Sequence, residues 1–308
     1  MRIGEVVGDH WRIAREIGSG GMGVVYAAED QRGGPDVALK ILREDVRALD
    51  GTVPRFLREV RLAAQLRSRH AVRILGSGTT KCGGPFMVME LLEGVNLSDV
   101  AKERSRVSEG EAVEWLIGAC DAVGEAHEVG IVHRDLKLGN IFLSLPRIGI
   151  PLVKVLDFGL AKNLLSNEPS LTAPDDGFGT PQFMPPEQYI DVAEVDARSD
   201  VWSLAVCLYR LVTGVYPVRG RTMAQLCIEV ARKDFIAPSA RSHLRTVSRE
   251  LDRVLACALS REKNDRYPDA VHLGAALRAI NSEIIRRPPM RDVAPASCTR
   301  LMPHVVRT

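Results

Sequence analysis

The chain has 308 residues, of which 45% are apolar and 26% are charged, and its formal net charge is +2. This length is sufficient for a sizeable core and about two domains, and the near-neutral charge gives no reason to expect nucleic acid as a partner. No stretch reaches the roughly 18 consecutive apolar residues of a membrane-spanning helix. The N-terminus also lacks the basic and then apolar pattern of a signal peptide, so we expect a cytoplasmic chain without a membrane segment.

The six cysteines are widely separated, and none of them forms a C-x-x-C pair. This spacing favours reduced thiols in the core over a zinc site or a disulfide framework. The cysteines are Cys82, Cys120, Cys207, Cys227, Cys257 and Cys298.

The first part of the chain has the pattern of short strands joined by turns. Its apolar runs are separated by glycine and proline, which is typical of strands in a small sheet. These runs are 24–29, 36–42, 72–76 and 86–91. One stretch at about 54–66 has apolar residues at helical spacing instead, which predicts one helix among the strands.

A glycine-rich segment, Gly18-Ser19-Gly20-Gly21-Met22-Gly23, precedes the first of these runs. Glycines let the backbone approach phosphate groups closely and leave its amides free to bind them. The pattern G-x-G-x-x-G alone would equally open a dinucleotide-binding fold, in which a helix follows it. Here a strand pattern, Val24–Ala28, follows, so a phosphate-binding loop between two antiparallel strands is favoured.

Lys40 ends the apolar run Val37-Ala38-Leu39-Lys40, and Glu59 lies on the helix that follows. A lysine at a strand end ordinarily extends toward water, and Glu59 has nearby arginines as alternative partners. The run nevertheless resembles the V-A-I-K strand of protein kinases, in which the lysine holds phosphates and pairs with a glutamate of the next helix.

An acid, a base and an amide occur together in His133-Arg134-Asp135-Leu136-Lys137-Leu138-Gly139-Asn140. A carboxylate that meets a hydroxyl proton and an amide that meets a metal ion suit phosphoryl transfer. The segment matches H-R-D-L-x-x-x-N, the catalytic-loop signature of protein kinases, and Asp157-Phe158-Gly159 follows it at short range after a strand at 153–156. The order of the two motifs is far more specific than either motif alone.

Residues 160–178 are polar and predict a loop, and Gly179–Glu187 resembles the G-T-x-x-[YF]-x-A-P-E end of a kinase activation segment, with Pro185 in place of Ala. Ser199 is expected to cap the next helix, which contains Asp200. Two further amphipathic helices are expected near 248–260 and 268–283.

These motifs together resemble the eukaryotic-like (Hanks-type) serine/threonine protein kinases of bacteria, over about residues 11–283. The resemblance implies an α+β, bilobal protein-kinase-like fold. A small antiparallel β N-lobe with one main helix would span 1–92, a larger and mostly helical C-lobe 93–284, and a flexible tail 285–308. The implied activity is transfer of the ATP γ-phosphate to Ser or Thr of protein substrates with Mg²⁺, in signalling, with autophosphorylation in a transient homodimer.

The same resemblance implies the role of each site residue. Asp135 would be the base, Lys137 would steady the γ-phosphate, and Lys40, with Glu59 as its carboxylate partner, would hold the α- and β-phosphates. Asn140 and Asp157 would bind magnesium. ATP would contact Ile17, Gly18, Ser19, Gly20, Gly21, Gly23, Val25, Ala38, Lys40, Met89, Glu90, Leu92, Asn96 and Phe142. Structural roles would fall to His133, Phe158, Asp200 and the pair Glu187 and Arg266.

The expected regulatory residues lie around the activation segment. Arg134 beside Asp135 marks the kinases in which a loop phosphate pairs with that arginine. Thr172 is the first candidate for this phosphate and Ser170 the second. Asp176 stands where several relatives carry the phosphate, which suggests that Asp175 and Asp176 replace it in part; a solvated acidic turn is the alternative.

Two other functions are compatible with a kinase-like sequence. A pseudokinase scaffold would bind ATP without transfer, but such proteins usually lose one of Lys40, Asp135 and Asp157, and all three are present. A small-molecule phosphotransferase of the same superfamily would lack the peptide-docking segment 179–187.

Overall fold

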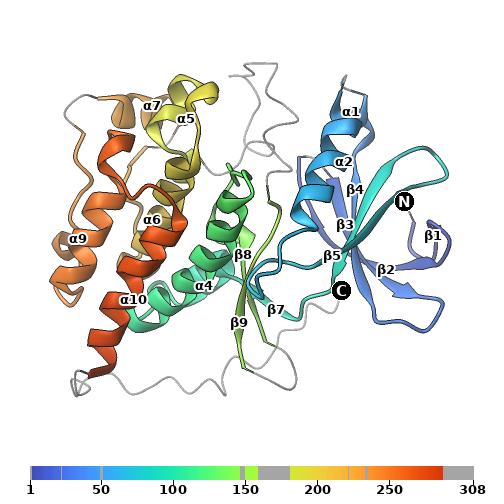
Figure 1. Ribbon diagram of the computed structural model, residues 1–308, viewed down its shortest axis with the longest axis horizontal. Coiled ribbons are helices and arrows are strands. Elements are labelled where there is room, and N and C mark those ends of the chain that lie inside the picture. The colour runs from blue at the N-terminus through green and yellow to red at the C-terminus, as the bar shows by residue number, and fades with distance from the viewer. Residues whose placement is uncertain are drawn as a thin grey trace.

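The computed structural model describes residues 2–21, 23–48, 51–145, 150–158, 181–220, 222–232 and 235–286. Figure 1 shows a strand-rich part that carries α1 and α2, and beside it a larger part built mainly of helices. This arrangement agrees with the predicted α+β, bilobal fold. The lobe boundaries at 92 and 284 stay predictions.

The first lobe is built on an antiparallel six-stranded sheet in the order β1-β2-β3-β4-β6-β5. The strands are β1 Val6–Val7, β2 Trp11–Ser19, β3 Gly23–Asp30, β4 Val37–Leu42, β5 Ile74–Thr79 and β6 Pro85–Glu90. Every side chain of β4 is buried, which explains its continuous apolar run. Most of β2 is not buried and carries Arg12, Arg15 and Glu16, so no apolar run marks it in the sequence.

Two helices accompany this sheet: α1 Glu44–Arg47 and α2 Thr52–Ala63. The predicted helix at 54–66 corresponds to α2, which starts and ends earlier. Phe56, Val60 and Ala63 are its buried apolar residues, and the first two belong to one cluster with Ala38 of β4. The helix is therefore held to the sheet by an apolar stripe at helical spacing.

A second, three-stranded sheet lies where the two parts meet (Figure 1). Its strands are β7 Gly94–Asn96, β8 Ile141–Ser144 and β9 Leu152–Val155. A Cβ on Gly94 would come within 2.1 Å of the carbonyl oxygen of Leu143, and its φ is +144°, so only glycine fits there. A bridge between Ala71 and Val155 connects the first lobe to this sheet.

The second lobe is helical. Its helices are α3 Leu97–Glu103, α4 Glu109–Glu128, α5 Pro186–Ile190, α6 Ala197–Thr213, α7 Met223–Ala231, α8 Ala240–His243, α9 Arg249–Ala258 and α10 Ala270–Arg286. Short 3₁₀ turns occur at Leu138–Asn140, Pro181–Phe183, Val192–Glu194 and Lys263–Asp265. Helix α6 is buried along nearly its whole length, and α4 and α10 pack side by side (Figure 1).

The start of α6 differs from the prediction. The sequence predicts Ser199 as its cap, but the helix begins at Ala197 and Asp196 is the cap. A carboxylate oxygen of Asp196 accepts from the backbone N–H of Arg198 at 2.9 Å, and the Ser199 hydroxyl accepts from the N–H of Asp196 at 3.3 Å. Ser199 is thus the partner in a capping box rather than the cap itself.

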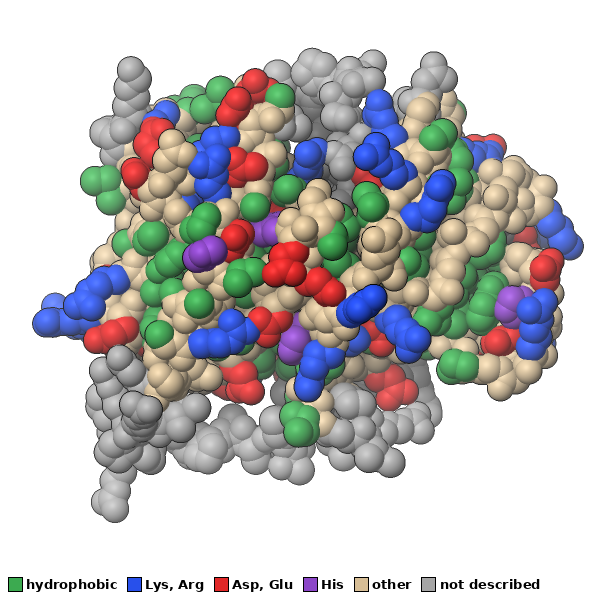
Figure 2. Space-filling model, in the orientation of Figure 1, with side chains coloured by type: hydrophobic (Ala, Val, Ile, Leu, Met, Phe, Trp, Pro, Cys, Tyr) green, Lys and Arg blue, Asp and Glu red, His purple; other side chains and the backbone are tan. Residues whose placement is uncertain are grey.

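The surface carries charges of both signs. Figure 2 shows acidic and basic side chains interspersed across one face, with several basic ones over α2. Within the described ranges, no helix combines the length and the apolar character that crossing a membrane requires.

Candidate active site

The glycine segment forms the turn between β2 and β3. Ser19 pairs with Val24 across the two strands, and the N–H of Gly20 donates to the carbonyl of Gly23 at 3.0 Å. A Cβ on Gly23 would approach the Ile41 carbonyl oxygen to 2.5 Å, whereas a Cβ on Gly18 or Gly20 would meet no atom within 4 Å. Gly23 is therefore required by packing, and the backbone of Gly18 and Gly20 is open to a ligand.

Lys40 makes an ionic contact between the two lobes. Its Nζ lies 2.6 Å from Oδ1 of Asp157, which follows β9. Burial acts to raise the pKa of Asp157, but the charge and the hydrogen bond of Lys40 outweigh it and hold that pKa below its ordinary value. The structure thus pairs Lys40 with Asp157; Glu59 lies on α2, and its predicted pair with Lys40 stays a prediction.

Several residues expected around an adenine ring gather in one apolar cluster. Ala38 and Met89 are 4% and 8% exposed, and Val25 and Leu92 pack against the same cluster. The cluster and the glycine turn share one sheet, because β3 begins at this turn and β3, β4 and β6 are neighbours. This placement fits an apolar ligand near the turn, and contact with adenine stays a prediction.

Glu90 and Asn96, which are expected to contact ATP, already use several of their polar groups. The Glu90 carboxylate accepts from Nζ of Lys154 at 2.6 Å, and its backbone N–H donates to the Arg73 carbonyl at 3.0 Å. The Asn96 side chain caps α3 by accepting from the N–H of Asp99 at 3.0 Å. A ribose contact would compete with this cap. Phe142, on β8, lies opposite Asn96 in the sheet.

The catalytic loop concentrates its polar groups on Asp135. Oδ2 of Asp135 accepts from Nζ of Lys137 at 2.9 Å and from Nδ2 of Asn140 at 3.2 Å. Nδ2 of Asn140 also donates to the Asp135 carbonyl at 2.8 Å. Because the nitrogen of the Asn140 amide faces the loop, its oxygen is left as an acceptor for another group.

The carboxylate of Asp200, on α6, binds backbone N–H groups of the catalytic loop. Its carboxylate is 1% exposed and accepts from the backbone N–H groups of His133 and Arg134, at 2.7 and 2.9 Å. His127 adds a third contact at 2.9 Å. Arg134 has a φ of +64°, in the left-handed region that non-glycine residues rarely adopt. The Asp200 contacts therefore support an unfavourable backbone conformation directly before Asp135.

The segment before Gly159 is fixed to the same loop. The ring of buried Phe158 lies 5.2 Å from the ring of His133, centroid to centroid. Nε2 of His133 contacts the carbonyl oxygen of Leu156 at 2.8 Å. These contacts bring Asp157 next to the catalytic loop.

Glu187 and Arg266 form a buried ion pair in the second lobe. The two guanidinium nitrogens of Arg266 donate to the two carboxylate oxygens of Glu187 at 2.8 and 2.9 Å. The Ser199 hydroxyl donates to the same carboxylate at 2.6 Å. Burial acts to raise the pKa of Glu187, and the bonds to Arg266 and Ser199 hold it below its ordinary value.

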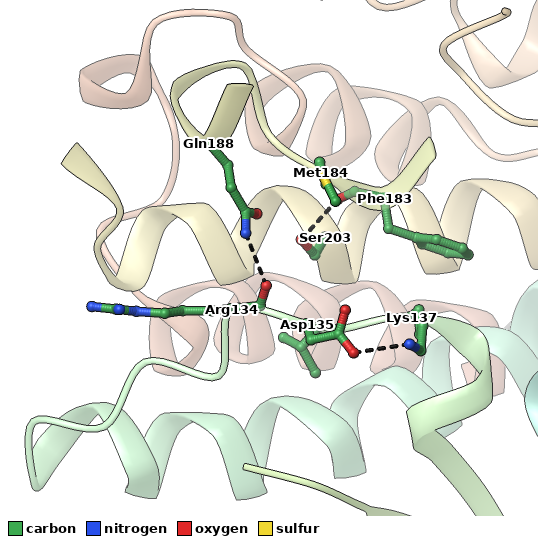
Figure 3. Close-up of a pocket in the computed structure, with 8 residues that line it drawn as sticks. Arg134, Asp135, Lys137, Phe183, Met184, Gln188 and Ser203 are labelled. Carbon is green, nitrogen blue, oxygen red and sulfur yellow. Dashed lines mark hydrogen bonds and ion pairs between the residues drawn. The ribbon is translucent and has the colours of Figure 1, made fainter. Parts of the chain in front are cut away.

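A pocket opens above Asp135, between the catalytic loop and the segment that begins α5 (Figure 3). In Figure 3 one carboxylate oxygen of Asp135 points to Lys137 and the other points into the pocket, toward Met184 and Ser203. The pocket is lined by Arg134, Asp135, Leu136, Lys137, Phe183, Met184, Gln188 and Ser203. The volume of this pocket is about 10 Å³, which is room for about one water molecule, so a single hydroxyl group placed there would face the base.

Comparison with known proteins agrees with this geometry. The sequence matches the protein kinase domain family over residues 11–274. The chain belongs to this family. Its relatives place it in the bacterial eukaryotic-like (Hanks-type) branch: the serine/threonine-protein kinase PknB of Mycobacterium tuberculosis is 35% identical over 277 residues, which cover 89% of this chain and 43% of PknB. The serine/threonine-protein kinase pkn3 of Myxococcus xanthus is 32% identical over 283 residues, covering 91% of this chain and 52% of pkn3.

Solved structures of the PknI kinase domain of Mycobacterium tuberculosis share the fold. One has a TM-score of 0.70 at 24% identity, with 91% of this chain and 99% of that chain covered. A second crystal structure of the same domain also gives 0.70 at 24% identity, with 92% and 99% covered. The chain spans less than half the length of the PknB relatives that it matches.

ATP as substrate, generally with Mg²⁺, follows from the kinase family, and the residues present fit this pair. Among the described residues, no three His, Cys, Asp or Glu side chains gather as a metal site. Magnesium is usually held by one or two carboxylates together with phosphate oxygens rather than by a protein cage. Asp157 and the amide oxygen of Asn140 supply such a partial donor set beside the open glycine turn.

Some residues of this kinase site were not expected from the sequence, and some expected ones cannot be placed. Met184, Gln188 and Ser203 line the pocket but hold no defining position of a motif, so only their packing marks them. Gly159 and the regulatory candidates Ser170, Thr172 and Asp176 lie outside the described residues.

Proposed function

We propose that the chain is an ATP-dependent protein kinase that transfers the γ-phosphate to Ser or Thr of protein substrates and to itself. The observation that carries this proposal is the Asp135 carboxylate. One of its oxygens is fixed by Lys137 and Asn140, and the other faces a pocket lined by Phe183, Met184 and Gln188. A small-molecule phosphotransferase is expected to lack the segment around these residues, so a peptide acceptor is favoured.

Each residue has a distinct part in the proposed transfer. Asp135 would orient the acceptor hydroxyl and accept its proton as the oxygen attacks the γ-phosphorus in line, while the bond from that phosphorus to the β-phosphate oxygen breaks and ADP leaves. Lys137, 2.9 Å from Asp135, is placed to neutralise charge on the transferred group. Lys40, on β4 of the first lobe, would hold the phosphates. A bound magnesium ion would supply charge neutralisation between the phosphates, with Asp157 and Asn140 as its protein ligands.

Asp135→Asn tests this assignment. The amide keeps the shape of the side chain but cannot accept the proton, so transfer to a generic basic protein should fall by about 10²- to 10⁴-fold. ATP affinity should stay within about twofold of the wild-type value, because the substitution leaves the residues that are expected to bind ATP unchanged. Transfer of radioactive phosphate and ATP titration by calorimetry measure the two effects.

Asp121→Asn is the matched control, since Asp121 lies on α4 and pairs with Arg278 on the surface. It should transfer phosphate like the wild type. Robust transfer by Asp135→Asn would refute the base assignment. A wild-type protein that binds ATP but transfers nothing would favour a pseudokinase scaffold instead. A cytoplasmic location and a transient homodimer stay predictions.

A further inference from the structure

A hydrogen bond crosses the pocket from α5 to the catalytic loop. The side-chain amide of Gln188 donates to the carbonyl oxygen of Arg134 at 3.2 Å (Figure 3). That carbonyl belongs to the peptide group that joins Arg134 to Asp135. We propose that Gln188 is a positioning residue, which fixes this peptide plane and thereby the direction of the Asp135 carboxylate; the proposal rests on the proposed kinase function.

The backbone at this point needs support from both sides. Arg134 has a φ of +64°, which carries strain in a residue other than glycine. Asp200 holds the N–H of Arg134 at 2.9 Å, but the next N–H, that of Asp135, reaches only Nδ1 of His133 at the long distance of 3.4 Å. The bond from Gln188 is therefore the shorter of the two contacts on the peptide that leads into Asp135.

Contacts on both sides of Gln188 fix the position of helix α5. Glu187, the neighbour of Gln188, is held by both guanidinium nitrogens of Arg266 and by the Ser199 hydroxyl. Tyr189, on the other side, donates its hydroxyl to the Pro181 carbonyl. Gln188 can therefore transmit the position of α5 to the catalytic loop.

The arrangement also couples two tasks of the site. Phe183, Met184 and Gln188 form the wall of the pocket that would receive the acceptor hydroxyl. Gln188 belongs to this wall and also binds the peptide group before Asp135, so a shift of the wall would change the orientation of the Asp135 carboxylate. The carboxylate would be aligned for transfer only when these pocket residues are in the positions seen here.

Gln188→Met removes the donor and keeps the length of the side chain. We expect kcat for peptide phosphorylation to fall about tenfold, because a small misplacement of a reacting group is costly. The KM for ATP should stay within about twofold. Gln188→Lys keeps a donor of similar reach and should recover most of the lost kcat. Amide hydrogen exchange in the peptide covering 131–140 should be faster in Gln188→Met than in the wild type, whether or not transfer occurs.

Ile190→Ala is the matched control on the same helix, since Ile190 is 65% exposed. It should leave both kcat and the exchange rate at the wild-type level. Unchanged kcat and unchanged exchange in folded Gln188→Met would overturn the proposal. Equal losses of kcat in Gln188→Met, Gln188→Lys and Ile190→Ala would also overturn it, because they would show only damage to α5. If the wild type transfers nothing, faster exchange in Gln188→Met would still support the positioning contact while the kinase function would be refuted.

Discussion

Two ion pairs, Glu187 with Arg266 and Lys40 with Asp157, differ in their solvent exposure and in their role. Glu187 and Arg266 meet at two points within one lobe, and their side chains are 10% and 0% exposed. Arg266 donates further to the carbonyls of Ser260 and Arg261. Lys40 and Asp157 meet at one point between the lobes, and the Asp157 side chain is 31% exposed.

This difference indicates that the pair of Glu187 and Arg266 belongs to the fold, whereas the pair of Lys40 and Asp157 belongs to the candidate site. A buried charge whose donors and acceptors are all supplied by the protein has no capacity left for a ligand. Within the described part of the chain, the hydrogen bond between Lys40 and Asp157 leaves other hydrogen-bonding positions of both groups open, and Lys40 pairs with Val25 on the strand that follows the glycine turn. Their contact can be replaced by phosphate on the lysine side and by a cation on the aspartate side, so we expect it to stabilise the fold little.

The largest effect is expected from Arg266→Met. Removal of one partner leaves Glu187 buried without its counter-ion, which typically costs about 3–5 kcal/mol. For a domain of this size the unfolding midpoint should fall by roughly 10 °C. Thermal unfolding followed by circular dichroism measures the change.

Arg12→Met is the control for this loss. It breaks the exposed pair of Arg12 with Glu29, in which each side chain is 51% exposed. Such pairs contribute about 0–1 kcal/mol. Equal destabilisation by the two variants would contradict the distinction between a buried and an exposed pair.

The next effect in size is expected from Lys40→Met, and it should fall on activity rather than on stability. Loss of a charge that holds the phosphates should lower phosphate transfer by about 10²- to 10³-fold. The free energy of unfolding should change by only about 1 kcal/mol, since Asp157 can still reach water. Lys102→Met, at a lysine that is 75% exposed, should change neither quantity. A large loss of stability in Lys40→Met would instead mean that the pair of Lys40 and Asp157 stabilises the fold, as the pair of Glu187 and Arg266 does.

The sequence predicted the fold, and it named loop residues that the structure brings together around Asp135, because both depend on local patterns. The buried faces of α2 and α9 repeat at helical spacing, and the loop residues Asp135 to Asn140 stand in a fixed motif. No apolar run marks strand β2, because most of its side chains are not buried and several are charged; it was expected only as the strand that precedes the glycine segment.

Contacts between distant segments could not be predicted in the same way. Gln188 contacts a backbone carbonyl 54 residues away, and neither the residue type nor its spacing marks that contact. The ionic partner of Lys40 likewise depends on how the lobes close. A sequence motif names Glu59 and Asp157 but does not determine which of them is nearer to the lysine.

The smallest of the expected effects is the pH dependence of the stability that Glu187 contributes. Its pKa in the folded chain is lowered because Arg266 and Ser199 outweigh burial. A group of this kind stabilises the fold above its unfolded pKa, about 4.3 for glutamate, and the contribution is lost as the pH falls through the lower folded-state pKa. Glu187→Gln should therefore be less stable than the wild type at pH 7, and the gap should narrow below about pH 4.3. Unfolding midpoints measured between neutral and acidic pH test this. A gap that stayed constant would mean that the carboxylate does not carry its charge in the folded kinase, and that the pair with Arg266 acts through hydrogen bonds alone.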